Sequence, residues 1–72
     1  MIRYDPHARD RMAERGVTEQ DVELALRRPR HRTPGPPGRI WIWGYAGSGR
    51  ELKVGVSTSD QRYVTTVYWA DE

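Results

Sequence analysis

The sequence contains no cysteine, and this absence excludes disulfide bonds and the thiolate zinc sites that stabilise many small domains. The two histidines, His7 and His31, lie far apart in the chain, so they do not make a metal site by themselves. We therefore expect neither a metal ion nor another cofactor.

Long apolar runs are also missing. No segment approaches the roughly 20 apolar residues that a membrane-spanning helix needs, and no apolar leader opens the chain. The sequence predicts a soluble, unprocessed protein that lies by default in the cytoplasm and has no membrane partner.

Phenylalanine is absent, and a chain of 72 residues can form only a thin core. A domain of this size buries about 60% of the surface that its unfolded chain exposes. Three tryptophans and four tyrosines are available, so large aromatics must supply much of the buried area. We expect one domain, residues 1–72, with a helical hairpin at 5–28, a linker at 29–38 and an antiparallel sheet at 39–69.

Lysine is nearly absent as well, since eleven arginines stand against one lysine in a chain whose net charge is only +2. Arginine offers a planar fork of donors that binds phosphate through paired hydrogen bonds and stacks on bases, which lysine cannot do. A GC-rich genome would produce the same bias whatever the function. Composition therefore favours a nucleic-acid partner only slightly.

Capping residues delimit the first of two short helices. Asp5 is a helix cap and Pro6 suits the first helical position, so the helix is predicted from Pro6 to Arg15. Gly16 fits the left-handed position that commonly follows a helix.

A second helix follows after a short turn. Thr18 is a helix cap with Asp21 three residues later, and the predicted helix runs from Glu19 to about Arg28, where Pro29 ends it. The apolar positions that the two helices would bury are Ala8, Met12, Val22, Ala25 and Leu26.

Three strand-like segments follow the proline-rich and glycine-rich linker. They are residues 39–45, 50–58 and 62–69, and short turns separate them. Consecutive strands with short turns form an antiparallel meander. The expected fold is α+β, a helical hairpin followed by a three-stranded antiparallel meander (ααβββ), with the hairpin on one face of the sheet and the other face partly open.

The first of these strands has two faces that compete for the core. Ile40 and Ile42 alternate with Trp41 and Trp43, and the rule that large aromatics dominate burial favours the tryptophan face as core. The alternative is an open face on which aromatics beside cations would stack unpaired bases. Its members, if the turns keep register, would be Trp41, Trp43, Lys53, Thr66 and Tyr68.

These residues together resemble a known family. The positions that carry the resemblance are His7, Ala8, Arg11, Met12, Arg15, Gly16, Val17, Thr18, Asp21, Val22, Ala25, Leu26 and Pro29, followed by a hairpin and a final Val-Thr-Thr-Val-Tyr strand. With them, nearly the whole chain resembles the small bacterial domain-of-unknown-function family 4258. That family is similar to the BrnT-like and RelE-like toxin ribonucleases, so the resemblance implies by fold-level analogy a RelE-like ribonuclease of the toxin–antitoxin type.

Metal-free RNA cleavage needs a base for the 2′-hydroxyl, an acid for the departing 5′-oxygen and cations on the phosphate. His7, Arg11 and Arg15 recur every fourth residue, so they form one stripe along the first helix. His7 is the candidate base or acid, and Arg11 and Arg15 are the candidate phosphate clamp. Tyr68 or Thr66 is the candidate donor from the sheet. The alternative is that His7 packs at the helix N-terminus and the arginines pair with nearby carboxylates.

A dense basic run follows the second helix and is interrupted only by Pro29. It is either a flexible contact for the RNA backbone or a loop that is merely soluble. Its members are Arg27, Arg28, Arg30, His31 and Arg32.

The sequence thus supports three hypotheses. The first is a small metal-independent endoribonuclease of the toxin type that binds single-stranded RNA between the helical stripe and the sheet. The second is a non-catalytic module that binds RNA, or a protein such as an antitoxin, through the open sheet face. The third is a homodimer that closes this face on itself, so both monomer and homodimer remain open.

Overall fold

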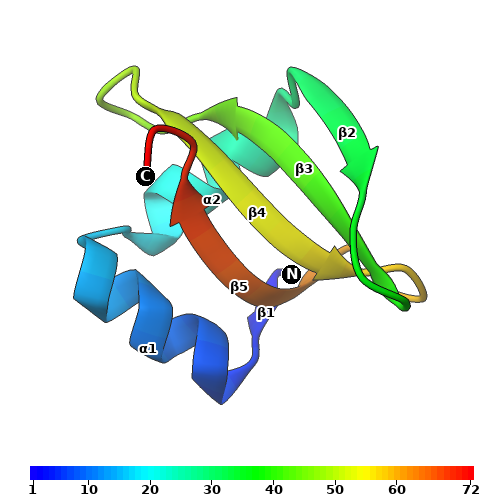
Figure 1. Ribbon diagram of the computed structural model, residues 1–72. Coiled ribbons are helices and arrows are strands. Elements are labelled where there is room, and N and C mark those ends of the chain that lie inside the picture. Colours follow the sequence, from blue (N-terminus) through cyan, green and yellow to red (C-terminus); the bar gives the residue numbers. More distant parts are fainter.

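A computed structural model describes all residues, 1–72, as two helices packed against one face of a five-stranded sheet (Figure 1). The elements in chain order are β1 (Arg3–Tyr4), α1 (Pro6–Arg15), α2 (Glu19–Arg27), β2 (His31–Pro34), β3 (Arg39–Tyr45), β4 (Glu51–Ser57) and β5 (Tyr63–Trp69). The predicted α+β class is confirmed. Neither helix has the length and apolar character that crossing a membrane would require.

Both helices begin at the predicted caps. The Asp5 side chain accepts a hydrogen bond from the His7 N–H, and Gly16 ends α1 with a φ of 68°. Thr18 and Asp21 form a reciprocal capping box at the start of α2. The caps satisfy free N–H groups at the starts of the helices. Both helices have boundaries within one residue of the prediction.

The sheet differs from the predicted three-stranded meander. Its strand order is β1-β5-β4-β3-β2, and β1 pairs with β5 in parallel, so the sheet is mixed and the expectation of a purely antiparallel meander is wrong. β1 has only two residues, which is too short for any alternation of apolar and polar residues to reveal it. The pairing of β1 with β5 depends on the tertiary fold, in which the chain runs beside β5 just before α1 begins.

The segment predicted as a linker also contains a strand. β2 pairs in antiparallel fashion with β3, opposite Ile40 to Trp43. Pro34 lacks an N–H, which is tolerated because β2 lies at the edge of the sheet and needs partners on one side only. The prolines and glycines that suggested an extended connection therefore mark an edge strand and the turn after it.

The ladder between β4 and β5 contains one irregularity. Gly55 lies opposite Thr66 while Val56 lies opposite Val64, so Thr65 is an extra residue in β5. The Thr65 hydroxyl donates to the Gly55 carbonyl oxygen at 3.1 Å. This arrangement is a β-bulge, which locally increases the twist of a strand.

The core is a layer of mainly small and β-branched side chains between the helices and the sheet. Its fully buried members include Ala8, Val22, Ala25, Leu52, Val54, Val56, Val64 and Val67. Such side chains allow a close approach of α2 to β3: a Cβ built at Gly44 would lie 2.5 Å from the Ala25 carbonyl oxygen.

The expectation that Trp41 and Trp43 face the core is wrong. Ile42 is buried and Ile40 packs against the core, while both tryptophans are half-buried on the opposite face of β3. The layer between α2 and β3 is too thin to hold an indole ring. Of the three tryptophans only Trp69 joins the core, with its indole N–H donating to the Arg15 carbonyl oxygen at 2.7 Å.

Candidate functional site

The face of the sheet opposite the helices carries one row of cross-strand neighbours. His31, Trp43, Lys53 and Tyr68 lie opposite one another on β2, β3, β4 and β5, and we call these four residues the outer row. They point away from the core because neighbouring residues such as Leu52 are buried in it. The row crosses four of the five strands.

Aromatic rings surround the ammonium group of Lys53. Its Nζ lies 4.7 Å from the ring centroid of Trp41, 5.3 Å from that of Trp43 and 5.0 Å from that of Tyr68. The imidazole of His31 stacks on Trp43 with centroids 5.1 Å apart. The side chain of Lys53 makes no salt bridge, so the ring faces are the groups that interact with its charge.

A second row on the same face holds the aromatic cluster in place. The indole of Trp41 lies over Gly55, where an added Cβ would come within 2.8 Å of Trp41 Cζ3. Thr66 lies beneath this cover, is only 2% exposed and has a hydroxyl without a hydrogen-bond partner. The prediction that the two tryptophans, Lys53, Thr66 and Tyr68 share one face is confirmed, but Thr66 forms its floor and is not accessible.

Arg15 extends the outer row beyond Tyr68. Its guanidinium carbon lies 4.8 Å from the Tyr68 ring centroid, and its Nε donates to both carboxylate oxygens of Glu72 at 2.8 and 2.9 Å. The backbone N–H of Trp69 also donates to Glu72, and this bond together with Arg15 holds the pKa of the Glu72 carboxyl below its ordinary value. Arg15 is therefore a partly neutralised cation that ties α1 to the end of β5.

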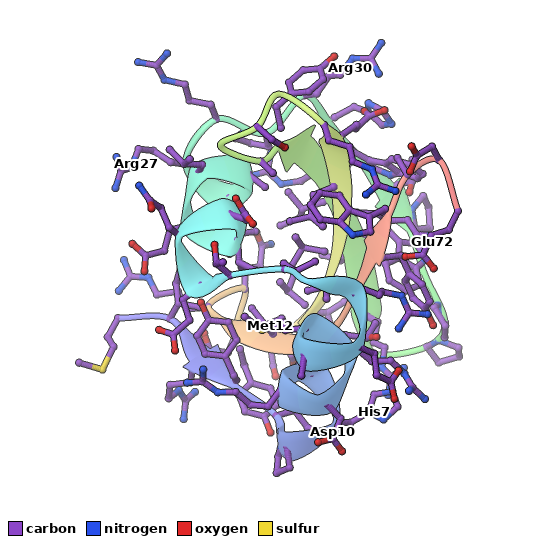
Figure 2. The ribbon with its side chains drawn as sticks, turned by 90° about the vertical axis from the view of Figure 1, so that its left-hand side faces the viewer. His7, Asp10, Met12, Arg27, Arg30 and Glu72 are labelled. Atoms are coloured by element: carbon purple, nitrogen blue, oxygen red, sulfur yellow. The ribbon has the colours of Figure 1, made fainter.

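The predicted stripe along α1 does not form a single site. Arg11 Nη1 donates to Glu14 at 2.7 Å, which is the carboxylate pairing considered as the alternative. His7 is exposed and lies eight residues from Arg15, which corresponds to about 12 Å of helix. Figure 2 shows His7 at one end of α1 and Glu72 beyond the other end. Of the stripe, only Arg15 reaches the outer row.

The basic run after α2 is divided between the two sides of the sheet. Arg30 pairs with Glu51 on β4 at 2.9 Å, and His31 stacks in the outer row. Arg27 and Arg32 instead line a groove on the helical side, and Arg28 is exposed at the end of α2. Figure 2 shows Arg27 and Arg30 projecting from different parts of the surface. The run therefore does not form one continuous surface.

His31 is the site residue that sequence reasoning missed, because we assigned it to the basic run only. The indole N–H of Trp43 donates to the Thr33 hydroxyl at 3.0 Å, which fixes the ring on which His31 stacks. The alternation of His31 and Thr33, with Arg32 between them, was the sequence signal that could have placed His31 on the same face as Trp43. It becomes visible only when β2 is recognised as a strand.

Comparison with known proteins identifies a family. No group of three histidine, aspartate or glutamate side chains is arranged to hold a metal ion. No curated protein and no solved structure matches the chain. The family described as "Domain of unknown function (DUF4258)" matches residues 4–69, a span that contains both helices and strands β2 to β5. The chain therefore belongs to the DUF4258 family.

Proposed function

We propose that the protein binds single-stranded RNA across the outer face of its sheet. The observation that carries this proposal is the position of Lys53, whose ammonium group lies among three aromatic rings with no carboxylate partner. An unpaired cation attracts a phosphate, and ring faces stack bases of any sequence. The outer row combines both elements of a single-strand binding surface.

The spacing of the row fits an extended strand. Neighbouring strands of a sheet lie about 4.8 Å apart, so the three steps from His31 to Tyr68 span roughly 14 Å. That length accommodates a few nucleotides. Duplex RNA keeps its bases inside the helix, so a platform of exposed rings selects single strands, loops or ends.

Removing the charge of Lys53 tests the proposal. Lys53→Met keeps the long apolar stem that packs between the rings and deletes the ammonium group. We expect weaker binding of a short fluorescent oligoribonucleotide, measured by anisotropy. The slope of log affinity against log salt concentration should fall by about 0.7, the contribution of one phosphate contact to a single strand.

Arg62→Met is the matched control, because Arg62 is exposed in the turn before β5 and contributes the same charge away from the outer row. Its salt slope should equal that of the wild type. Equal losses in the two variants would mean that RNA responds to net charge alone, and the outer row would not be the site.

Metal-independent RNA cleavage on the same face is a second candidate function. It is favoured by the kinds of side chain in the outer row, because His31, Lys53 and Tyr68 can all carry protons and Arg15 lies beside them. In this scheme the 2′-oxygen attacks phosphorus and the bond to the 5′-oxygen breaks. A base takes the 2′-hydroxyl proton, an acid protonates the leaving oxygen, and the product carries a cyclic phosphate.

The two histidines distinguish the possible sites of cleavage. We expect His31→Ala to lower the rate on labelled RNA in the presence of a chelator by about 100-fold or more, which is typical of removing an acid or base. His7→Ala should keep the wild-type rate, because His7 lies at the far end of α1. Loss of activity in His7→Ala alone would move the site to the helical stripe. If the wild type binds RNA without cleaving it, the protein is a binding module.

A further inference from the structure

A groove of about 830 Å³ lies on the helical side of the sheet, away from the outer row. Apolar side chains of Ile2, Leu26 and Ile42 form part of its wall, and they come from the start of the chain, α2 and β3. Volumes of this size and lining that mixes apolar surface with a few polar groups are typical of small-molecule sites.

One buried polar group lies at the groove without a partner. The hydroxyl of Tyr4 is shielded from solvent and makes no hydrogen bond within the protein. Burial, followed by the charges of Glu19 and Glu23, raises the pKa of this phenol. A buried donor without an acceptor costs stability, and a ligand that supplies an acceptor would remove that cost.

Arginines outnumber carboxylates among the charged side chains that line the groove. Glu19, at the first turn of α2, pairs with Arg9, whose guanidinium lies over the Tyr4 ring. Two arginines that line the groove have no carboxylate partner, Arg27 at the last turn of α2 and Arg32 on β2. The eight residues from Glu19 to Arg27 correspond to about 12 Å of helix. Arg62, which also lines the groove, has no carboxylate partner either, so three of the lining arginines are unpaired.

We propose that this groove binds a small organic anion with an apolar body, whose anionic group lies against Arg27 and Arg32 and whose acceptor atom meets the Tyr4 hydroxyl. Carboxylates, sulfonates and phosphates share the required chemistry, because each accepts the forked hydrogen bonds of arginine. The site lies on the other side of the sheet from the outer row. It is therefore separate from the RNA surface.

Two fluorescent probes of similar size test the proposal. Anilinonaphthalene sulfonate is an aromatic anion, and N-phenylnaphthylamine is an uncharged analogue. We expect the wild type to bind the sulfonate saturably at one site per chain. Arg27→Met/Arg32→Met should weaken sulfonate binding about tenfold or more and leave the uncharged probe unchanged, because only the charge-assisted hydrogen bonds are lost.

Arg28→Met/Arg39→Met is the matched control, since it removes two exposed arginines that do not line the groove. This variant and Lys53→Met should bind the sulfonate as the wild type does, and a saturating oligoribonucleotide should not displace the probe. Salt provides a test that needs no variant. Raising it from about 50 to 500 mM should weaken binding of the sulfonate and spare the uncharged probe.

Three results would overturn the proposal. The first is no saturable sulfonate binding by the wild type. The second is an equal loss of both probes in Arg27→Met/Arg32→Met, because the arginines would then hold the shape of the groove. The third is a loss of sulfonate binding in Lys53→Met, which would place the probe on the outer face and leave the RNA proposal unaffected.

Discussion

The Gly44→Ala variant is expected to lose a large part of its free energy of unfolding. An added Cβ would lie 2.5 Å from the Ala25 carbonyl oxygen and 2.8 Å from Ala25 Cα, so α2 would have to move away from β3. Overpacking a core usually costs about 1–3 kcal/mol, and more when backbone must shift. A domain of 72 residues has roughly 4–11 kcal/mol of total stability, so the loss is a large fraction of it. Urea unfolding followed by circular dichroism measures the effect.

Gly47→Ala is the control for this variant. A Cβ at Gly47 would meet only Leu24 and Asp21 side chains, at 3.5 and 3.6 Å, and the backbone there does not have a positive φ. Its unfolding midpoint should stay close to that of the wild type. An unchanged midpoint for Gly44→Ala would contradict the close contact between α2 and β3 on which the buried isoleucine face depends.

Among substitutions in the outer row, Trp43→Ala is expected to produce the largest loss of RNA affinity. Stacking one base on an aromatic side chain contributes about 1–3 kcal/mol, which corresponds to a loss of roughly 5-fold to 150-fold. The substitution also removes the ring on which His31 stacks and the donor to Thr33. Anisotropy with the same labelled oligoribonucleotide provides the measurement, and the unfolding midpoint shows whether the sheet is intact.

Trp43→Phe distinguishes stacking from a structural role. Phenylalanine keeps a flat ring but cannot donate to Thr33, so it should recover most of the affinity if the ring stacks a base. If alanine and phenylalanine lower affinity equally, the indole hydrogen bond matters and the ring does not. Full affinity in the alanine variant would exclude the outer row as the RNA surface.

The helices and the three long strands could be predicted because their signals are local. Caps, a left-handed glycine and alternating side chains lie within a few residues of the boundaries that they determine. β1 and β2 could not be predicted in this way. A two-residue strand has no periodicity, and β2 is recognisable only by its pairing with β3.

The buried face of β3 shows the same limit. Its alternation of isoleucine and tryptophan is symmetric, so the pattern alone permits either face to be buried. The close approach of Gly44 to Ala25 determines which face of β3 is buried, and this approach depends on the tertiary fold.

The candidate site was predictable only in part. The shared face of Trp41, Trp43, Lys53 and Tyr68 followed from strand parity, and the contacts around Lys53 confirm it. The carboxylate partners of the α1 stripe were not predictable, because periodicity reveals which cations align and not which carboxylates pair with them. Glu72 lies 57 positions from Arg15 in sequence, so no local pattern connects them.

The extra residue in β5 changes which alternate side chains of that strand face the core. Val64 and Val67 are both buried although they are three residues apart, a spacing that a regular strand would place on opposite faces. Thr65 is the extra residue that restores the pairing with β4, so Trp69 lies in the core while Tyr68 points outward to Lys53. A single inserted threonine thus makes one strand serve two surfaces, with its first half aligned to β1 and its second half aligned to the aromatic cluster.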